Sequence, residues 1–269
     1  MRLLDSSLQT ICAFVSSSDN TRDVFAQVSK SFSVFWPDCP FQKYVGLNTP
    51  DSTDDLSGFE PIYAPVGGWR PELLSQIRLL PKSIEYILLF LDDFLLLERV
   101  DNSNLERILE KALENKLKYL RLIPISRAII PQVFRQLSRM FRMSDWERIP
   151  DRMPYYSSLQ VALWKRAHLE GMLELKGGIW DFENQWISGV SHYAVADTAL
   201  INYVHVVEKG KWQATARRLF GKVNLPFWHG HRKTLSPTRQ FILKFNKIKF
   251  LFIGYSYVKL KRFFTGKLV

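Results

Sequence analysis

Apolar runs alternate with amphipathic segments through the first half of the chain. Runs typical of strands occupy residues 10–15, 44–47, 58–64, 86–91 and 119–123. Apolar residues at helical spacing occupy residues 21–32, 71–80 and 102–116. The run at 86–91 (YILLFL) is apolar throughout, as in a strand that is buried on both faces. Alternating strands and helices predict a parallel or mixed sheet that helices cover on both sides.

The second half of the chain is less regular. An arginine-rich stretch at residues 126–154 predicts helix and loop over the sheet. Beyond it the pattern predicts strands at 155–163 and 199–207, and helices at 165–173 and 212–220. No internal repeat interrupts this order, so a single α/β body is expected.

Charge divides the chain into two unequal parts. The net charge is +11, but residues 209–269 hold 15 Lys and Arg and no Asp or Glu. The body that precedes them is therefore mildly acidic. We predict a catalytic domain at residues 1–212 and a basic helical extension at 213–269 whose partner is anionic.

Cysteine content and hydropathy point to a cytoplasmic protein. The two cysteines, Cys12 and Cys39, cannot build a disulfide framework, which favours a reducing compartment. Residues 1–10 lack the pattern of a secretory signal. No apolar run approaches the roughly 20 residues that span a bilayer.

Two adjacent carboxylates, Asp92 and Asp93, follow the strand at 86–91. Ligands of α/β sheets bind beyond the carboxyl ends of the strands, so the pair lies where a site is expected. Neighbouring carboxylates repel each other unless a cation or hydrogen-bond donors compensate, and a divalent metal that holds a diphosphate is one such solution. The alternative is a solvated pair in a turn, where Asp is common.

Asp92-Asp93-Phe94 resembles the aspartate motif of nucleotide-sugar glycosyltransferases of the GT-A type. Other motifs follow the order seen in bacterial envelope-polysaccharide transferases that build lipopolysaccharide or capsule: Ser16-Ser17-Ser18-Asp19, WPDC at 36–39, YSSLQVALW at 156–164, WDFE at 180–183 and KGKW at 209–212. The resemblance implies a single Rossmann-like GT-A domain with a mixed central sheet. Here the motif is Asp-Asp-Phe, whereas the family pattern is Asp-x-Asp.

The resemblance implies roles for residues that bind a nucleotide-sugar donor. Ser16 and Asp19 would contact the base or ribose, although a plain helix cap is the alternative. Asp92 or Asp93 would coordinate a metal, Mn²⁺ or Mg²⁺, or the sugar.

Two basic residues and one histidine near the end of the motif set are also assigned to the donor. Lys209 and Lys211 flank a glycine and would neutralise the leaving phosphates, unless they form an exposed turn. His205 would be a further metal ligand or face the diphosphate, unless it is structural.

The WDFE segment supplies candidates for acceptor chemistry. Asp181 or Glu183 would be the general base that deprotonates the acceptor hydroxyl, and we favour Asp181 because it follows Trp180. Capping of a helix is the alternative for Asp181. Trp180 and Tyr156 would form the wall for the acceptor. A single base opposite the leaving group would invert the anomeric centre.

The basic extension carries an apolar stripe at helical spacing, formed by Phe241, Phe245, Ile248 and Phe252, with Lys244 and Lys247 at its margins. This mixture suits the headgroup region of an anionic membrane. We expect a protein that is peripheral on the inner membrane face and acts on a glycan or lipid-linked acceptor. Packing of the stripe against the catalytic domain is the alternative.

Two other function classes are compatible with the composition. A non-catalytic scaffold on a degenerate transferase fold would keep the same elements. A nucleic-acid-binding protein would explain the sequence pI of about 9.6, but the charge is confined to one end and no recognised RNA- or DNA-binding motif is present. We therefore expect no nucleic-acid partner.

Overall fold

The computed structural model describes residues 8–52, 55–125, 144–243, 245–246 and 249. Twelve strands and six helices alternate along them: β1 (Ile11–Ser16), α1 (Arg22–Phe35), β2 (Gln42–Leu47), β3 (Glu60–Tyr63), α2 (Trp69–Leu79), β4 (Tyr86–Leu91), β5 (Phe94–Leu96), α3 (Asn102–Glu114), β6 (Tyr119–Arg121), β7 (Trp146–Arg148), β8 (Ala162–Lys165), α5 (Arg166–Leu173), α6 (Ile179–Glu183), β9 (Tyr193–Val195), β10 (Tyr203–His205), β11 (Val207–Glu208), β12 (Lys211–Trp212) and α7 (Ala216–Lys222). Residues 237–243 are also helical.

Eight strands form one mixed sheet in the order β3-β2-β1-β4-β8-β6-β9-β7. Strands β3, β2, β1 and β4 run parallel to one another, whereas β8 runs antiparallel to both β4 and β6. β9 is parallel to β6, and β7 is antiparallel to β9. The predicted mixed α/β sheet is confirmed.

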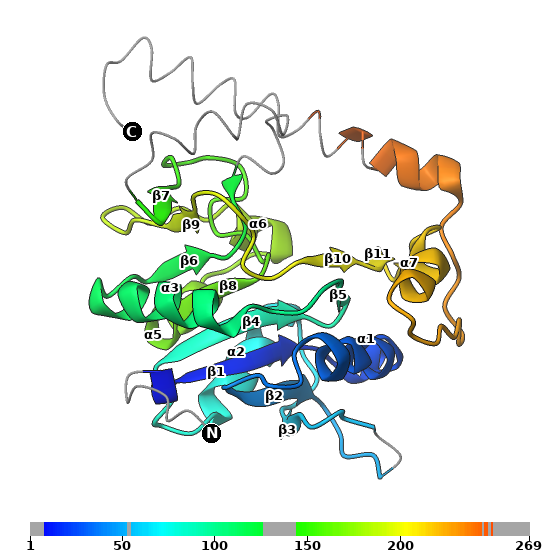
Figure 1. Ribbon diagram of the computed structural model, residues 1–269. Helices are drawn as coiled ribbons and strands as arrows, with labels where there is room; N and C mark the ends of the chain where they lie inside the picture. The colour runs from blue at the N-terminus through cyan, green and yellow to red at the C-terminus, as the bar shows by residue number, and fades with distance from the viewer. Residues whose placement is uncertain (1–7, 53–54, 126–143, 244, 247–248, 250–269) are drawn as a thin grey trace.

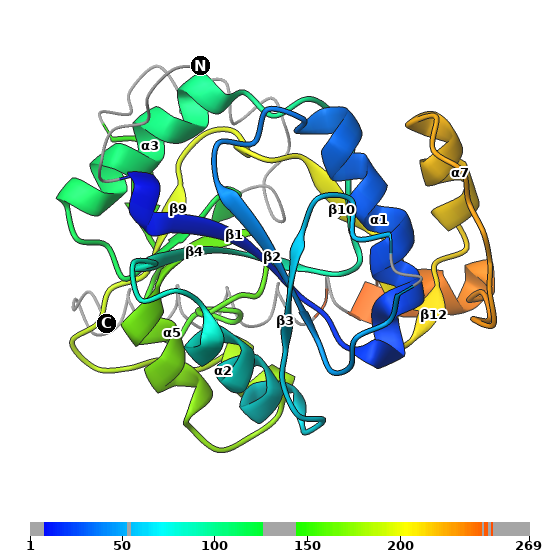
Figure 2. The same ribbon diagram turned by 90° about the horizontal axis from the view of Figure 1, so that it is seen from below.

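Helices cover both faces of this sheet. Figure 2 shows α1 and α3 on one face and α2 and α5 on the other. Side chains of β1 alternate between them, because Ala13 and Val15 belong to the core beneath α1 and α3, and Cys12 and Phe14 to the core beneath α2 and α5. β1 is buried at all six positions, which explains why its first five residues are apolar.

A third apolar cluster joins the outer face of α1 to the segment that follows β10. Val24 and Val28 of α1 pack with Leu95, and Trp212 and Phe220 complete the cluster from the far end of the chain. Figure 1 shows α7 beside α1. The boundary predicted after Trp212 therefore falls inside a packed cluster, and the segment that follows it begins as part of the body.

Polar contacts extend this attachment beyond α7. Arg232 pairs with Asp23 at the start of α1, with Nε 2.7 Å from Oδ2. The Gln27 side chain donates to the Trp228 carbonyl and accepts from the Trp228 amide, each at 2.8 Å. Farther on, Phe241 and Phe245 are 70% and 58% exposed. Ile248, Phe252 and the flanking Lys244 and Lys247 lie outside the described residues, as do the basic residues from 259 onward.

Several predicted elements differ in extent from the observed ones. The strand expected at 155–163 is β8, which begins only at Ala162, because Tyr155 adopts φ +59° and the chain turns through residues 151–156. The strand expected at 199–207 is divided into β10 and β11. The helix expected at 212–220 is α7, which begins at Ala216, since Trp212 lies in a strand. None of the helices that the structure describes is long and apolar enough to cross a bilayer.

Two histidines are buried as a pair on the α5 side of the sheet. The Nε2 atoms of His168 and His192 lie 2.9 Å apart. His192 Nδ1 is 3.2 Å from the Tyr156 carbonyl oxygen, which can only accept, so His192 accepts from His168 at Nε2. Burial, aided by the neighbouring His168 and Lys118, lowers the pKa of His192 to about 3. Burial and Lys118 lower the pKa of His168 to about 4.

We predict that this pair makes the fold sensitive to acid. Below pH 6.5 the imidazoles gain protons in the unfolded chain but not in the folded one, so stability falls as the pH drops toward 4. His192 alone accounts for on the order of 2 kcal/mol at pH 5. Urea unfolding at pH 7.5, 6 and 5 measures the effect. In His168→Gln the loss between pH 7.5 and 5 should be smaller; an unchanged loss contradicts the assignment.

Candidate active site

A cavity of about 320 Å³ opens at the carboxyl ends of β1 and β4. We call it the serine-loop pocket, because the loop that follows β1 forms one wall of it. α2 supplies another wall through Trp69 and Glu72, and Asp92 also lines the pocket. The parallel pairing of β1 with β4, which ends at Ser16 opposite Leu91, brings the loop and the carboxylate to the same edge.

Asp19 fixes the serine loop to the end of β2. Its carboxylate accepts hydrogen bonds from the Asn48 amide, the Thr49 hydroxyl and the Arg22 guanidinium. Burial acts to raise the pKa of Asp19, but these hydrogen bonds outweigh it and lower the pKa to about 2. These hydrogen bonds make Asp19 a residue that holds the serine loop in place, whereas Ser16 lines the pocket itself.

Glu72 and Gln76 of α2 hold the floor of the serine-loop pocket. The Glu72 carboxylate accepts from Asn48 Nδ2 at 2.8 Å and from the Gly67 amide at 3.1 Å. Gln76 Nε2 donates to the Ser17 carbonyl at 3.4 Å. A Cβ on Gly46 would lie 2.1 Å from Gln76 Oε1, so the glycine in β2 is needed for this approach.

Asp92 projects into the serine-loop pocket as a poorly compensated carboxylate. Burial and the charge of Asp93 raise the pKa of Asp92 to about 7. Hydrogen bonds from Thr21 and Ser17 and the charge of Arg232 act in the opposite direction but do not restore an ordinary value. A cation beside the pair would favour the ionised form.

Asp93 and His205 are in direct contact. Asp93 Oδ2 lies 3.2 Å from His205 Nδ1, and the Asp93 carbonyl accepts from the Val206 amide at 3.0 Å. The contact follows from the antiparallel pairing of β5 with β10, which sets His205 opposite Phe94. Phe94 packs edge-on against the imidazole at 4.6 Å. The structure thus brings together two residues predicted as metal ligands.

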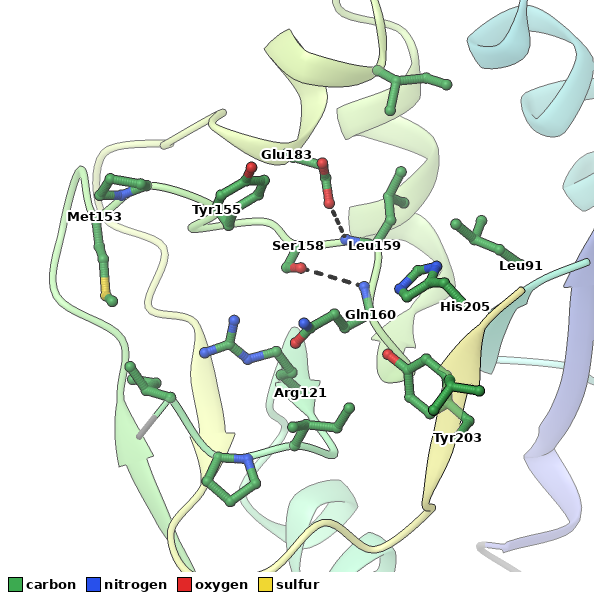
Figure 3. Close-up of a pocket in the computed structure, with 16 residues that line it drawn as sticks. Leu91, Arg121, Met153, Tyr155, Ser158, Leu159, Gln160, Glu183, Tyr203 and His205 are labelled. Carbon is green, nitrogen blue, oxygen red and sulfur yellow. Dashed lines mark hydrogen bonds between the residues drawn. The ribbon is translucent and has the colours of Figure 1, made fainter. Parts of the chain in front are cut away.

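A second cavity, of about 490 Å³, adjoins the first. We call it the Arg121 pocket, after the guanidinium that projects into it from β6 (Figure 3). Leu91 and Ile179 line both cavities, so the two are neighbours. Its wall includes His205, Tyr203, Tyr155, Met153, Gln160 and Glu183. The two pockets together offer adjoining space for two reactants.

The two candidate bases of α6 differ in position. Glu183 lines the Arg121 pocket, where its Oε1 accepts from the Leu159 amide at 3.1 Å (Figure 3). Asp181 is exposed, and its Oδ2 accepts from the Gly178 amide at 2.7 Å, which caps the helix. A Cβ on Gly177, where φ is +122°, would lie 2.7 Å from the Asp181 side chain. The arrangement favours Glu183 over Asp181, contrary to the preference drawn from sequence.

Arg70 of α2 fixes the loop that leads into α6. Its guanidinium donates to the carbonyls of Met172, Leu175 and Gly178. The same group lies over the Phe182 ring, 5.4 Å from the centroid. Arg70 therefore sets where the short helix, and with it Glu183, meets the pocket.

The two residues predicted for the acceptor wall lie elsewhere. Tyr156 is fully buried in the core, where its hydroxyl donates to the Val190 carbonyl at 2.8 Å. Trp180 is 62% exposed on α6 and packs near Tyr155, with ring centroids 6.0 Å apart. Tyr155 lines the Arg121 pocket in place of its neighbour Tyr156. The sequence thus indicated the segment that lines the pocket, but of its two adjacent tyrosines the structure places Tyr155 there.

Lys209 and Lys211 belong to an exposed hairpin turn between β11 and β12, with Lys209 at φ +51° and Gly210 at φ +72°. Arg232 ties this turn to the serine loop, because it donates both to the Gly210 carbonyl and to the Asn20 carbonyl. The two lysines are thereby held beside the loop that lines the serine-loop pocket.

The residues present suit a divalent cation that shares its ligands with a substrate. In the part of the chain that the structure describes, no three His, Cys, Asp or Glu side chains converge as a complete metal site. Asp93 and His205 do converge, and Asp92 is a neighbouring carboxylate in need of compensation. Mg²⁺ and Mn²⁺ commonly take one or two protein carboxylates and complete their shell with substrate phosphates and water.

Three residues of the site were missed from sequence. Glu72 and Arg232 make contacts between distant parts of the chain, which periodicity does not reveal. Arg121 could have been found from sequence, because it is a charged residue within the apolar run at 119–123. Charged residues are rarely buried in a strand unless they have a partner.

The sequence matches no protein-family model and no curated protein. Several solved structures are similar to it at low sequence identity, each with a TM-score below 0.5. S. aureus TarS 1–349 is 14% identical over 69% of this chain and 60% of that one, with a TM-score of 0.40. Galactosyltransferase LgtC, in complex with donor and acceptor sugar analogues, is 10% identical over 88% and 94%, with a TM-score of 0.41. Glucosyl-3-phosphoglycerate synthase from Mycobacterium tuberculosis, in complex with Mn²⁺, UDP and glucosyl-3-phosphoglycerate, is 12% identical over 82% and 83%, with a TM-score of 0.37.

Proposed function

We propose that this protein is a glycosyltransferase that moves a sugar from a nucleoside diphosphate sugar to a hydroxyl of a glycan or lipid-linked acceptor. One observation carries the proposal: two adjoining pockets meet at the carboxyl end of β4, where Asp92 lines the serine-loop pocket and both Glu183 and His205, the partner of Asp93, line the Arg121 pocket. Such an arrangement suits two substrates that react across a shared boundary.

The serine-loop pocket takes the nucleoside. Its hydroxyls from Ser16 and Ser17 and the amide of Gln76 are hydrogen-bonding groups for a ribose or base, and Trp69 supplies an aromatic wall. The diphosphate then extends toward Asp92 and Asp93. Lys209 and Lys211, held beside the serine loop by Arg232, contribute positive charge to the leaving phosphates.

Asp93 and His205 would hold Mn²⁺ or Mg²⁺ together with the diphosphate oxygens. The bound cation would neutralise the charge that develops on the leaving nucleoside diphosphate. The protein's own part is positional, since the β5–β10 pairing sets the carboxylate and imidazole in contact. Asp92 supplies a second negative charge next to the cation.

Glu183 acts as the general base in the Arg121 pocket. The acceptor oxygen attacks the anomeric carbon while its proton passes to the Glu183 carboxylate. The bond from the anomeric carbon to the diphosphate oxygen breaks, and the electron pair leaves with the nucleoside diphosphate. Attack from the face opposite the leaving group inverts the anomeric centre. The Leu159 amide orients the base.

The exposed Phe241 and Phe245, set in the basic C-terminal segment, support docking on an anionic membrane. Each Lys or Arg near such a surface contributes about 1 kcal/mol of attraction. We place the enzyme in the cytoplasm, peripheral on the inner membrane face, where it elongates an envelope polysaccharide or lipopolysaccharide. Docking concentrates the enzyme near a lipid-linked acceptor.

We predict that the chain binds one class of nucleoside diphosphate and that Mn²⁺ strengthens this binding. Thermal shifts with UDP-, GDP-, CMP- and dTDP-sugars, with and without Mn²⁺, identify the donor. Asp93→Ala should abolish the Mn²⁺-dependent part of the shift and leave the fold intact. If no nucleotide sugar shifts the melting temperature and none is turned over, the proposal is wrong.

Glu183→Gln should lower kcat by about 10²-fold or more with little change in donor affinity, because the acceptor proton loses its base. Asp181→Asn is the matched control on the same helix, and its kcat should stay within a few fold of wild type. The comparison needs a soluble acceptor and saturating donor. Loss of turnover in Asp181→Asn with an active Glu183→Gln would reverse the assignment.

For membrane docking, Phe241→Ser combined with Phe245→Ser should weaken binding to vesicles that contain anionic lipid. Turnover of a soluble acceptor should persist, since both side chains are largely exposed and neither lines either pocket. Val66→Ser, which replaces an apolar side chain that is 75% exposed in the loop after β3, is the matched control. Sedimentation with vesicles at low and high salt gives the measurement. Equal vesicle binding by both variants removes the docking proposal.

A further inference from the structure

Arg121 enters the Arg121 pocket from the end of β6 and is only 7% exposed. Its partners in register are Ala162 on β8 and Ala194 on β9. Residues that are paired in register share a face of the sheet, so the long side chain is flanked by two small ones. Figure 3 shows the guanidinium pointing into the cavity, on the side away from Glu183.

This guanidinium has no partner in the described part of the chain. No side chain or carbonyl there accepts a hydrogen bond from it, no carboxylate pairs with it, and its Nε is buried and unsatisfied. Arg232 offers a contrast, since its side chain is 8% exposed but pairs with Asp23. A buried charge that lacks a partner destabilises the fold, so its retention at a cavity wall points to a partner that arrives from outside.

We infer that Arg121 binds an anionic group, a carboxylate or a phosphate monoester, on the acceptor sugar. The inference rests on the proposed function and specifies its acceptor class. The planar guanidinium fork matches both groups in a bidentate manner, and the hydrogen bonds gain strength from their charges. The enzyme then elongates an acidic glycan and rejects neutral acceptors.

The rest of the pocket is consistent with such a ligand. Ser158 and Gln160 offer polar groups between Arg121 and Glu183 (Figure 3). Met153 and Tyr155 provide an apolar wall for a sugar ring. Because Glu183 repels an anion, the charged group of the acceptor lies at Arg121 and a neutral hydroxyl lies at the base. These two contacts would fix the orientation of the acceptor sugar in the pocket.

The adjoining serine-loop pocket is a poor place for the same anionic group. Asp92 and Glu72 line it, and an anion there needs a cation for compensation. Without Mn²⁺ or nucleotide, a negatively charged sugar therefore has its best partner at Arg121. This separates acceptor binding from donor binding in an experiment.

Isothermal titration of the full chain, without nucleotide or divalent cation, tests the inference. D-glucuronate supplies the carboxylate, D-glucose 6-phosphate the phosphate, and D-glucose the neutral control. We expect at least one acidic sugar to bind about 10-fold or more tightly than glucose, and Arg121→Met to remove that preference. The stronger of the two acidic ligands identifies the anion. Arg148→Met, which removes a surface charge paired with Asp151, should keep the preference.

Unfolding measurements distinguish a loss of sugar binding from a loss of the folded structure. Without ligand, Arg121→Met should be at least as stable as wild type, because an unpaired buried charge is removed. Arg121→Lys retains the charge without the fork and should bind the acidic sugar more weakly than wild type. Equal binding of neutral and acidic sugars, or a preference that survives in Arg121→Met, overturns the inference.

The two proposals fail separately. Binding of acidic sugars that depends on Arg121, without turnover of any nucleotide sugar, leaves the anion site standing and removes the transferase. If neutral acceptors are turned over and Arg121→Met does not change this turnover, the transferase proposal stands and the anion site is removed.

Discussion

The parallel pairing of β1 with β4 is the constraint on which the site depends. Six residue pairs, from Ile11 opposite Tyr86 to Ser16 opposite Leu91, fix the register. A slip of one residue would exchange the side chains that face α1 and α3 with those that face α2 and α5, so core packing forbids it. Because the strands end together, the serine loop and the Asp92–Asp93 pair leave the sheet side by side. The packing of the apolar core thus fixes the positions of the polar side chains of the site.

The parts that could be predicted from sequence are those encoded by contiguous residues. The run YILLFL is buried on both faces, and its abrupt end at two aspartates indicated the edge where the pockets open. The metal roles of Asp93 and His205 were instead implied by the family resemblance, and the β5–β10 pairing places these two residues in contact. Alternation of strands and helices was sufficient for the mixed sheet and its covering helices.

The parts that could not be predicted depend on orientation and on contacts between distant residues. Asp181 and Glu183 are two positions apart and chemically alike. What separates them is the partner of each carboxylate: Asp181 accepts from the Gly178 amide at the helix end, whereas Glu183 accepts from the Leu159 amide at the pocket wall. Short strands such as β5, β7 and β9 have three residues each, too few for a period to be detected. The position of Arg121 in an apolar run indicated burial, but the cavity that it enters is formed only when β8 and β9 flank β6.

The ion pair between Arg232 and Asp23 joins residues 209 positions apart in the chain. Contacts of such high sequence separation are costly in loop entropy and form late in folding. During translation, a nascent chain that has not yet extended past α7 lacks the apolar cover of the cluster around Val24, and one that has not extended past Arg232 lacks the hydrogen bond that holds Asn20. The loop that lines the serine-loop pocket therefore reaches its final order only after Arg232 has been synthesised, later than the strands of the central sheet.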